Sequence, residues 1–374
     1  MSGVVVAGAL ANKPGNGGEA WVRLAWLRGI ADLGVDVHLV ESLVGHADVA
    51  ADGPEAAWFD TVTADAGLAG RATLLDGRGA PLRGPGVADL ADDGAVLVDL
   101  SGSLADAGLV ARFRRRTYVD LDPGWTQLWD AAGLLGDVLD RYDTHLTVGD
   151  AVASCGLPLS RRHWRPVRPL VLLSDWDTAS AVPAGGPLTT VASWRSPSGT
   201  LPYDGRELGG KARSWRPLAG LPAQVPQPCT AVVAAHPADD GDLGRLRDGG
   251  WAVLEPSAVA TTDAYRAFVH ASSGELSVAQ ELYVATRCGW TSDRTAAYLA
   301  SGRPAVVQDT GFSQALRGSP ALRPFETCEQ AVAACRDLAA ACPQELSAAA
   351  RALAEAVFST RTVLPRVLDL AGVR

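Results

Sequence analysis

Short apolar runs alternate with longer amphipathic segments along the first half of the chain. The runs VVVAGAL (4–10) and VDVHLVE (35–41) flank a segment, residues 20–34, whose apolar side chains recur with helical spacing. This order of strand, helix and strand predicts a βαβ unit at the start of the protein. Further strand-like runs follow at 95–100, 117–121 and 144–148. The alternation predicts a parallel sheet with helices on both faces.

The second half repeats this pattern after a stretch rich in Pro, Gly and Trp, residues 157–187, which we interpret as a domain boundary. Strand-like runs lie at 188–194, 229–236, 251–255, 277–280 and 304–309, and helical segments at 239–249, 260–271 and 292–301. The last 45 residues have the pattern of consecutive helices. We therefore expect an α/β protein with two Rossmann-like domains, 1–168 and 169–345, followed by C-terminal helices, 346–374.

Composition excludes several classes of protein. The chain has 374 residues, of which 47% are hydrophobic and 20% charged, and its net charge is −9. An acidic chain without a concentrated basic surface does not favour a nucleic-acid partner. The N-terminus has no basic region typical of a signal peptide, and no apolar stretch is long enough for a membrane span, so we expect a cytoplasmic protein. The sequence indicates no oligomeric state.

The six cysteines do not form a recognisable site. They include no CxxC pair and no partnered histidines at metal-ligand spacing. We interpret them as small apolar side chains in a reducing compartment. No metal site is predicted.

Polar residues gather at the two ends of the stretch GWTSDRTAAYLASGRPAVVQDTGF, residues 289–312. Ser292, Asp293 and Arg294 precede an apolar helix, and the second group, Asp309-Thr310-Gly311, follows an apolar strand. In an open α/β sheet, ligands bind where strands end and helices begin. The exposed amides of a helix N-terminus suit a phosphate group, and Arg294 would add bidentate hydrogen bonds. The alternative is an ordinary helix cap without a ligand.

A glycine-rich loop joins the first strand to the first helix. It contains Asn16, Gly17 and Gly18 and lacks a complete GxGxxG motif, so it is a weak dinucleotide fingerprint. The loop would let backbone amides face a ligand in a cleft. A plain turn between strand and helix is the alternative interpretation.

Several of these segments resemble the GT-B glycosyltransferases. The segment Ala300–Val307, after a polar helix start, is similar to the donor-binding region of that family. The segments YVDLDPGWTQLW and THLTVGD resemble more closely a bacterial group of glycosyltransferase-like proteins that also carries SWR and TGFS segments. The resemblance implies two Rossmann-like domains facing a central cleft, with the acceptor side in 1–168 and the donor side in 169–345. It also implies that the C-terminal helices pack back across the domains.

The resemblance implies transfer of a sugar from a nucleotide-diphosphate donor to a small-molecule or glycan acceptor. GT-B proteins stabilise the departing diphosphate with side chains and helix amides, so no metal and no cofactor beyond the nucleotide-sugar donor are expected. The candidate cations are Arg195, Lys211 and Arg294. For Arg195 and Lys211, solvated loop charges are the alternative. His236 ends a second-half strand and would face the donor, although an ordinary surface imidazole is the simpler interpretation.

Candidates for acid–base chemistry come from the first half. Asp122, which follows a strand in VDLDPGW, is the first candidate for a general base on an acceptor hydroxyl, and Asp150 is the second. Asp120-x-Asp122 is not interpreted as a metal-binding DxD motif, because the resemblance implies the two-domain glycosyltransferase pattern that works without a metal. His46 follows the second strand and would face an acceptor.

The sequence departs from the family at one position. Many retaining GT-B enzymes have a Glu that binds the nucleotide ribose where this chain has Ala297. Glu275 or Glu281 would have to replace that contact. Two other functions therefore stay open: a non-catalytic glycosyltransferase-like scaffold or partner subunit, and a sugar-nucleotide epimerase, which needs acid–base carboxylates and no acceptor pocket.

Overall fold

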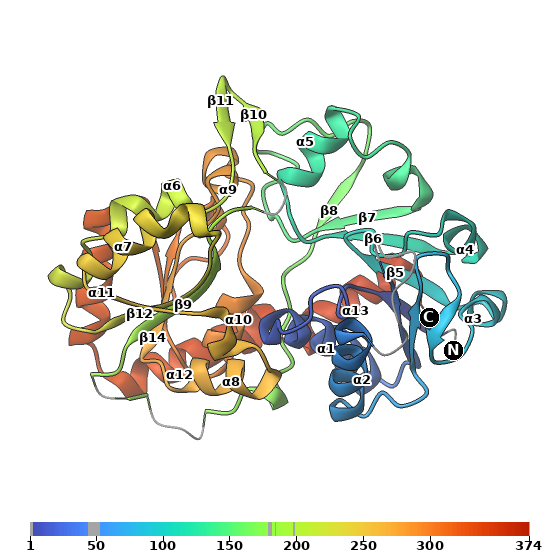
Figure 1. The fold of residues 1–374 in the computed structure, drawn as a ribbon, viewed down its shortest axis with the longest axis horizontal. Helices are drawn as coiled ribbons and strands as arrows, with labels where there is room; N and C mark the ends of the chain where they lie inside the picture. Colours follow the sequence, from blue (N-terminus) through green and yellow to red (C-terminus); the bar gives the residue numbers. More distant parts are fainter. Residues whose placement is uncertain (1–2, 44–52, 179–181, 184, 197–198, 374) are drawn as a thin grey trace.

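The computed structural model describes residues 3–43, 53–178, 182–183, 185–196 and 199–373. Two separate sheets, each flanked by helices, form two halves that lie side by side (Figure 1). A small antiparallel hairpin, β10 (Leu201–Tyr203) and β11 (Arg206–Leu208), projects from the second half between the two. The fold class predicted from the sequence, two Rossmann-like units in an α/β protein, is confirmed.

The sheet of the first half has eight strands in the order β4-β3-β2-β1-β5-β6-β7-β8. Its strands are β1 (Val4–Ala7), β2 (Val37–Ser42), β3 (Ala72–Leu75), β4 (Pro81–Arg83), β5 (Val96–Leu100), β6 (Arg116–Asp120), β7 (Thr144–Thr147) and β8 (Trp164–Pro166). Every pairing is parallel except that of β3 with β4. The helices of this half are α1 (Gly17–Asp32), α2 (Pro54–Asp65), α3 (Ala88–Asp92), α4 (Ala107–Arg112) and α5 (Trp125–Ala131).

The sheet of the second half has six strands in the order β13-β12-β9-β14-β15-β16, all paired in parallel. Its strands are β9 (Leu188–Ser193), β12 (Cys229–Ala234), β13 (Trp251–Leu254), β14 (Gly274–Ser277), β15 (Ala305–Gln308) and β16 (Leu322–Phe325). The helices are α6 (Ala212–Trp215), α7 (Asp240–Asp248), α8 (Thr262–His270), α9 (Glu281–Thr286), α10 (Asp293–Ala300) and α11 (Cys328–Ala340). In both sheets the central strands are buried on both faces, as expected for parallel strands covered by helices.

The prediction of one strand in this half is wrong. The apolar run at 277–280 is not a strand, because β14 covers Gly274–Ser277 and ends where the predicted strand begins. The strand was missed because its centre carries a charged residue, Glu275, which is fully buried against Arg294. A buried ion pair of this kind interrupts the apolar pattern from which strands are recognised.

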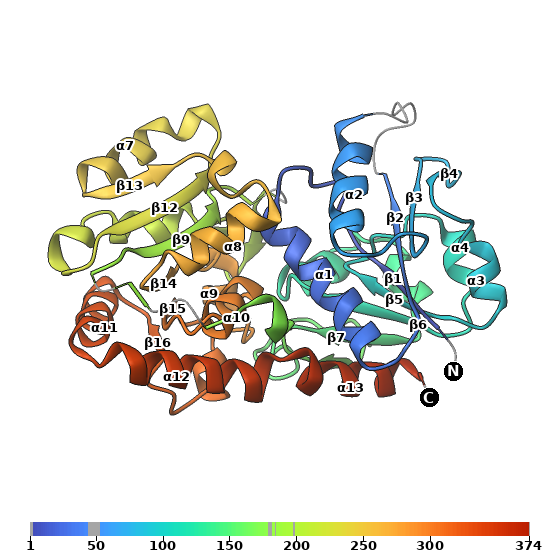
Figure 2. The same ribbon diagram turned by 90° about the horizontal axis from the view of Figure 1, so that it is seen from below.

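The C-terminal helices connect the two halves. Helix α12 (Pro343–Leu353) packs on α10, and a single π-helical turn at Ala354–Phe358 leads into α13 (Thr360–Ala371), which contacts α1 and β5 of the first half. Figure 2 shows α12 and α13 running along one side of both halves. The prediction that these helices pack back across the domains is confirmed. The domain boundaries after residues 168 and 345 stay predictions.

Backbone hydrogen bonds join the halves at two places. The chain entering the second half meets the chain leaving it, because Val171 N–H donates to Phe358 O and Thr360 N–H donates to Val171 O. At the carboxyl end of β7, Asp150 N–H donates to Gly289 O and Ala151 N–H to Cys288 O. These contacts place the carboxyl edges of the two sheets next to one another.

Candidate functional site

The loop after β1 is held by one buried carboxylate. Glu41 of β2 accepts hydrogen bonds from the backbone N–H groups of Leu10, Ala11 and Asn12, at 2.8, 2.6 and 2.8 Å, and from the Asn12 side-chain amide at 2.7 Å. Burial raises the pKa of Glu41, while these hydrogen bonds act in the opposite direction. The loop that carries the glycine motif is therefore rigidly anchored at its start.

The N-terminus of α1 points into the space between the halves. Asn16 caps the helix by accepting from Glu19 N–H at 3.2 Å. A Cβ on Gly17 would lie 2.1 Å from Thr261 O, and one on Gly18 would lie 2.8 Å from the Tyr265 ring. Glycine is thus required at these positions because the first half approaches α8 of the second half without room for a side chain.

Two cations and one carboxylate project from this loop and helix. Glu19 accepts from Lys13 Nζ at 2.9 Å and forms an ion pair with Arg23, four residues further along α1. Burial acts to raise the pKa of Glu19, but the charges of Arg23 and Lys13 outweigh it and lower that pKa to about 2. Glu19 is therefore ionised at neutral pH, and it fixes both cations in place.

Asp120 and Asp122, at the end of β6, have different surroundings. Asp120 is fully buried and accepts hydrogen bonds from Thr126, Gln127 and Thr147, and burial raises its pKa to about 6. Asp122 is exposed to the space between the halves. The protein around this space limits hydration of the carboxylate, and this raises the pKa of Asp122. Asp120 thus shapes the strand end, and Asp122 is available to a ligand.

A chain of hydrogen bonds connects Asp122 to the second half. Tyr283 of α9 donates its hydroxyl to Asp122 Oδ1 at 2.6 Å, and the same hydroxyl accepts from Gln280 Nε2 at 3.2 Å. Gln280 Oε1 in turn accepts from Trp125 Nε1 at 2.9 Å. The Tyr283 ring stacks on Trp290 with a centroid separation of 4.6 Å. Residues of both halves therefore fix the orientation of the Asp122 carboxylate.

Helix α10 begins at the opposite side of the same space. Ser292 caps it by accepting from Arg294 N–H at 3.2 Å, and Asp293 is the first helical residue. Arg294 lines the second of the two cavities described below, but its guanidinium is held by the protein: it donates to Glu275 Oε1 at 2.6 Å, to Ser277 Oγ at 2.7 Å and to Val191 O. Arg294 thereby ties α10 to β14 and β9.

Lys211 is a buried cation of a different kind. It lies just before α6, and its side-chain ammonium makes no hydrogen bond or ion pair with any residue that the structure describes. Burial, and secondarily the charge of Arg294, lower its pKa to about 7. A buried amine without a partner is a strong candidate for contact with an anionic ligand.

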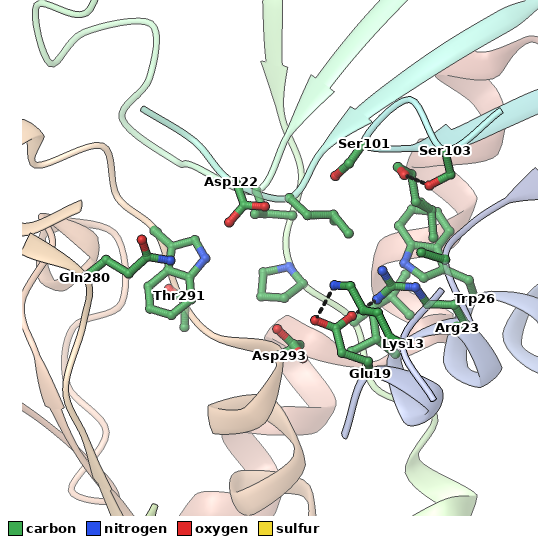
Figure 3. A pocket seen from close by; sticks show the side chains of 18 of the residues that line it. Lys13, Glu19, Arg23, Trp26, Ser101, Ser103, Asp122, Gln280, Thr291 and Asp293 are labelled. Carbon is green, nitrogen blue, oxygen red and sulfur yellow. Dashed lines mark hydrogen bonds and ion pairs between the residues drawn. The ribbon is translucent and has the colours of Figure 1, made fainter. Parts of the chain in front are cut away.

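Two adjoining cavities collect these side chains, and Figure 3 shows the first of them. The first cavity, about 330 Å³, is lined from the first half by Lys13, Glu19, Arg23, Ser101 and Asp122, and from the second half by Gln280, Tyr283, Thr291 and Asp293, among others. The second cavity, about 390 Å³, lies over the ends of β9 and β12 and includes Gly15, Asn16, Gly18, Tyr265 and Ser292. Glu19, Lys211 and Asp293 line both cavities. The two spaces therefore meet at one charged junction.

Three predicted donor-side residues lie on the surface of the second half. Arg195 forms an exposed ion pair with Asp239 at 2.7 Å. His236 accepts from Ala238 N–H at 3.1 Å as the cap of a 3₁₀ turn. Glu281, at the start of α9, faces Arg213. Glu275, the other proposed replacement for the missing ribose contact, is fully enclosed with Arg294.

The segment after β15 is organised as a turn. Asp309 accepts from Gly311 N–H at 2.9 Å and from Ser313, and it pairs with Arg287 at 3.0 Å. Thr310 donates its hydroxyl to Trp290 O at 2.5 Å, and Gly311 adopts a φ of +97°. This turn supports the segment that precedes α10, since Thr310 O accepts from Gly289 N–H.

The structure describes one of the two remaining acid–base candidates. Asp150 pairs with Arg168 at 2.6 Å, and burial raises its pKa. His46 lies outside the described residues.

Sequence reasoning missed several residues that line the first cavity. Glu19 and Arg23 carry one signal that was available, the i,i+4 pair on the first helix next to the glycine loop, and Lys13 precedes that loop. Tyr283 and Thr291 gave no such signal, because only the tertiary contact of α9 and its following loop with the first half brings them to Asp122.

No group of three or more His, Cys, Asp or Glu side chains within the described ranges is arranged to hold a metal ion. In that same part of the chain, no helix has the length and apolar character needed to cross a membrane.

Comparisons with known proteins identify the fold. No family model matches the sequence, and no curated protein matches it at a significant level. Among solved structures, the chain is similar to Alr3699/HepE from Anabaena in complex with UDP and glucose, with 12% identity, a TM-score of 0.56 and coverage of 99% of both chains. It is also similar to a trehalose-6-phosphate protein from E. coli bound with UDP-2-fluoro glucose, with 12% identity, a TM-score of 0.55 and full coverage of both chains.

A third similar structure is AviGT4, a glycosyltransferase involved in avilamycin A biosynthesis, with 14% identity, a TM-score of 0.53 and coverage of 99% of this chain and 97% of that one. The likeness extends over nearly the whole chain in each case. The protein therefore has the GT-B fold of glycosyltransferases, as the sequence resemblance implied.

Proposed function

We propose that this protein is a glycosyltransferase that moves a sugar from a nucleotide-diphosphate donor to a small-molecule or glycan acceptor without a metal ion. The observation that carries the proposal is the junction of the two cavities, where Lys211 and the N-terminus of α10 face Asp122 and Glu19 of the other half. Structural neighbours bound to UDP or a UDP-sugar support a nucleotide-sugar donor.

The second cavity suits the donor nucleotide. It lies at the carboxyl ends of β9 and β12, where α/β proteins bind nucleotides, and its floor includes the start of α10. Backbone amides at a helix N-terminus and the Lys211 ammonium would together bind the diphosphate and stabilise it as it leaves. Asp293, at the junction, is placed to accept hydrogen bonds from hydroxyl groups of the transferred sugar.

The first cavity suits the acceptor. Asp122 faces it, and we propose that Asp122 accepts the proton of the acceptor hydroxyl if the reaction inverts the sugar carbon. A raised pKa brings a carboxylate closer to the range in which a general base works efficiently. A separate cavity beside the donor site favours transfer over epimerisation, which requires no second substrate.

Donor binding can be tested by calorimetry with nucleoside diphosphates, in buffer with and without EDTA. Lys211→Met should bind about 10- to 100-fold more weakly, whereas Arg213→Gln, two residues away in an exposed ion pair with Glu281, should keep the natural affinity. If the natural protein binds no nucleotide, the scaffold hypothesis takes precedence. If binding requires a divalent metal, the metal-independent mechanism is wrong.

Transfer itself requires a second measurement. Incubation with a bound donor and a panel of acceptors should release nucleoside diphosphate faster than donor alone, and Asp122→Asn should remove that difference if Asp122 is the base. Epimerisation would show instead as isomerised donor sugar in the absence of any acceptor.

A further inference from the structure

The first cavity contains a buried cation whose hydrogen-bonding capacity is only partly used. Arg23 is 4% exposed and lines the first cavity, and one of its terminal nitrogens pairs with Glu19. Its Nε–H is buried and has no partner among the described residues. A buried donor of a charged group that lacks an acceptor in the protein is costly, so a water molecule or a ligand oxygen is expected to satisfy it.

The charges around Arg23 favour a negatively charged ligand. Lys13 and Arg23 are both cationic, and Glu19 stays ionised because its pKa is about 2. These three groups therefore carry a net charge of about +1 at neutral pH, whereas Asp122 and Asp293, which line the same cavity, add carboxylates outside this cluster. The Lys13 ammonium has three donors, and one of them is used by Glu19. Both cations can thus bind a further anionic oxygen without releasing Glu19.

The opposite wall of the first cavity is suited to hydroxyl groups. Thr291, from the second half, is 1% exposed, and its hydroxyl has no partner among the described residues. Ser101 lies near the cations, and Asp122 lies between the two walls (Figure 3). A ligand that satisfies both walls needs an anionic group at one end and hydroxyl groups at the other.

We assign the donor diphosphate to the second cavity, so another anion is needed for the cations of the first. Lys13 and Arg23 line the first cavity alone, whereas Lys211 and Asp293, at the start of α10, line both cavities. Accepting the proposed function, on which this inference rests, we propose that the acceptor is an acidic sugar or sugar derivative whose carboxylate or phosphate binds Arg23 and Lys13. Its hydroxyl groups then face Thr291 and Asp122, and Glu19 holds the two cations at the correct spacing.

Binding measurements in the presence of saturating UDP test this inference without requiring transfer. The probes are glucose, glucuronate, glucose 6-phosphate and inorganic phosphate, with binding followed by calorimetry and thermal shift. We expect an anionic sugar to bind at least tenfold more tightly than glucose. Glucuronate and glucose 6-phosphate distinguish a carboxylate from a phosphate, and inorganic phosphate tests whether the anion alone suffices.

Two variants connect the effect to the cations. Arg23→Gln and Lys13→Gln should each weaken binding of the anionic sugar by about 10- to 100-fold, the loss expected for a hydrogen bond to a charged group. Lys13 is exposed, so its variant tests the inference even if Arg23→Gln folds poorly. Arg112→Gln, an exposed ion-pair residue of α4, is the control and should bind like the natural protein. UDP binding should be unchanged in all three variants.

The outcomes separate this inference from the proposed function. Equal affinity for glucose and the anionic sugars, absence of binding by every probe, or anionic binding that survives Lys13→Gln would overturn it while UDP binding stands. Failure of every nucleoside diphosphate to bind would instead contradict the proposed function, and anion binding that depends on Lys13 would then still support an anion site in this cavity.

Discussion

Arg294 and Lys211 are two buried cations of the second half with opposite surroundings. Each guanidinium nitrogen of Arg294 donates to Glu275, Ser277 or a backbone carbonyl, and the ion pair with Glu275 raises its pKa despite burial. Lys211 has no partner among the described residues, and its pKa falls to about 7. Both were predicted from sequence to bind a diphosphate. The difference shows that a buried charge satisfied by the protein holds the fold, whereas an unsatisfied one is open to a ligand.

The largest effect expected from this comparison is on stability. Arg294→Met removes one partner of a buried ion pair and leaves Glu275 uncompensated, so the free energy of unfolding should fall by about 3–5 kcal/mol. Urea denaturation followed by circular dichroism measures this. The control is Arg195→Met, because Arg195 forms an exposed pair and that variant should unfold at the same urea concentration as the natural protein. Equal midpoints for both variants would show that Arg294 does not hold α10.

The next effect is on ligand affinity. Lys211→Met removes a partnerless cation, so the folded state should not become less stable, but nucleoside diphosphate binding should weaken by about 1.5–3 kcal/mol, or 10- to 100-fold. Calorimetry gives the affinity, and a thermal melt without ligand gives the stability. Unchanged affinity would place the diphosphate elsewhere.

The same residue predicts a pH dependence of binding. In the free protein Lys211 loses its proton as pH rises through about 7, and a bound diphosphate would favour the charged form. Above pH 7, Lys211 must take up a proton when the diphosphate binds. The binding free energy should therefore become less favourable by up to about 1.4 kcal/mol per pH unit between pH 7 and 9. Lys211→Met should show a flat profile over this range. A flat profile in the natural protein would contradict the prediction.

The smallest effect concerns the link between the halves. Tyr283→Phe keeps the aromatic stack but removes the hydroxyl that donates to Asp122 at 2.6 Å. The hydrogen bond lowers the pKa of Asp122, so its loss should move the acid limb of the rate profile to higher pH. The loss of this hydrogen bond should raise the activation free energy by about 1 kcal/mol, so the rate near neutral pH should fall roughly fivefold. A lower rate with an unmoved acid limb would indicate a purely structural role.

The fold could be predicted from sequence because parallel α/β units carry their signal locally. Apolar runs such as β1 and β12 and the helices between them follow from residue spacing alone. Strand β14 could not be predicted, since its charged centre becomes compatible with burial only when Arg294 of another element meets it. Short peripheral strands such as β8 lack sufficient length for a recognisable pattern.

The location of the candidate site could be predicted from the sequence, but only some of its residues could. Asp122, Lys211, Asp293 and the glycine loop lie at the meeting of the two cavities because strand ends and helix starts share one edge of each sheet. Sequence position does not determine which way a side chain turns at that edge. Arg195 turns to Asp239 at the surface, while Tyr283 reaches across to the other half.

The paired crossings at Val171 and Phe358–Thr360 determine how the molecule can move. The chain passes between its halves twice, and the two passages are hydrogen-bonded to each other. Any rotation of one half against the other has to turn about this double strand as a pivot, which permits hinge bending and resists sliding. Deleting α13 would therefore do more than shorten the protein, because it would cut one strand of the pivot, remove the contacts of α13 with α1 and β5, and leave one covalent connection between the halves.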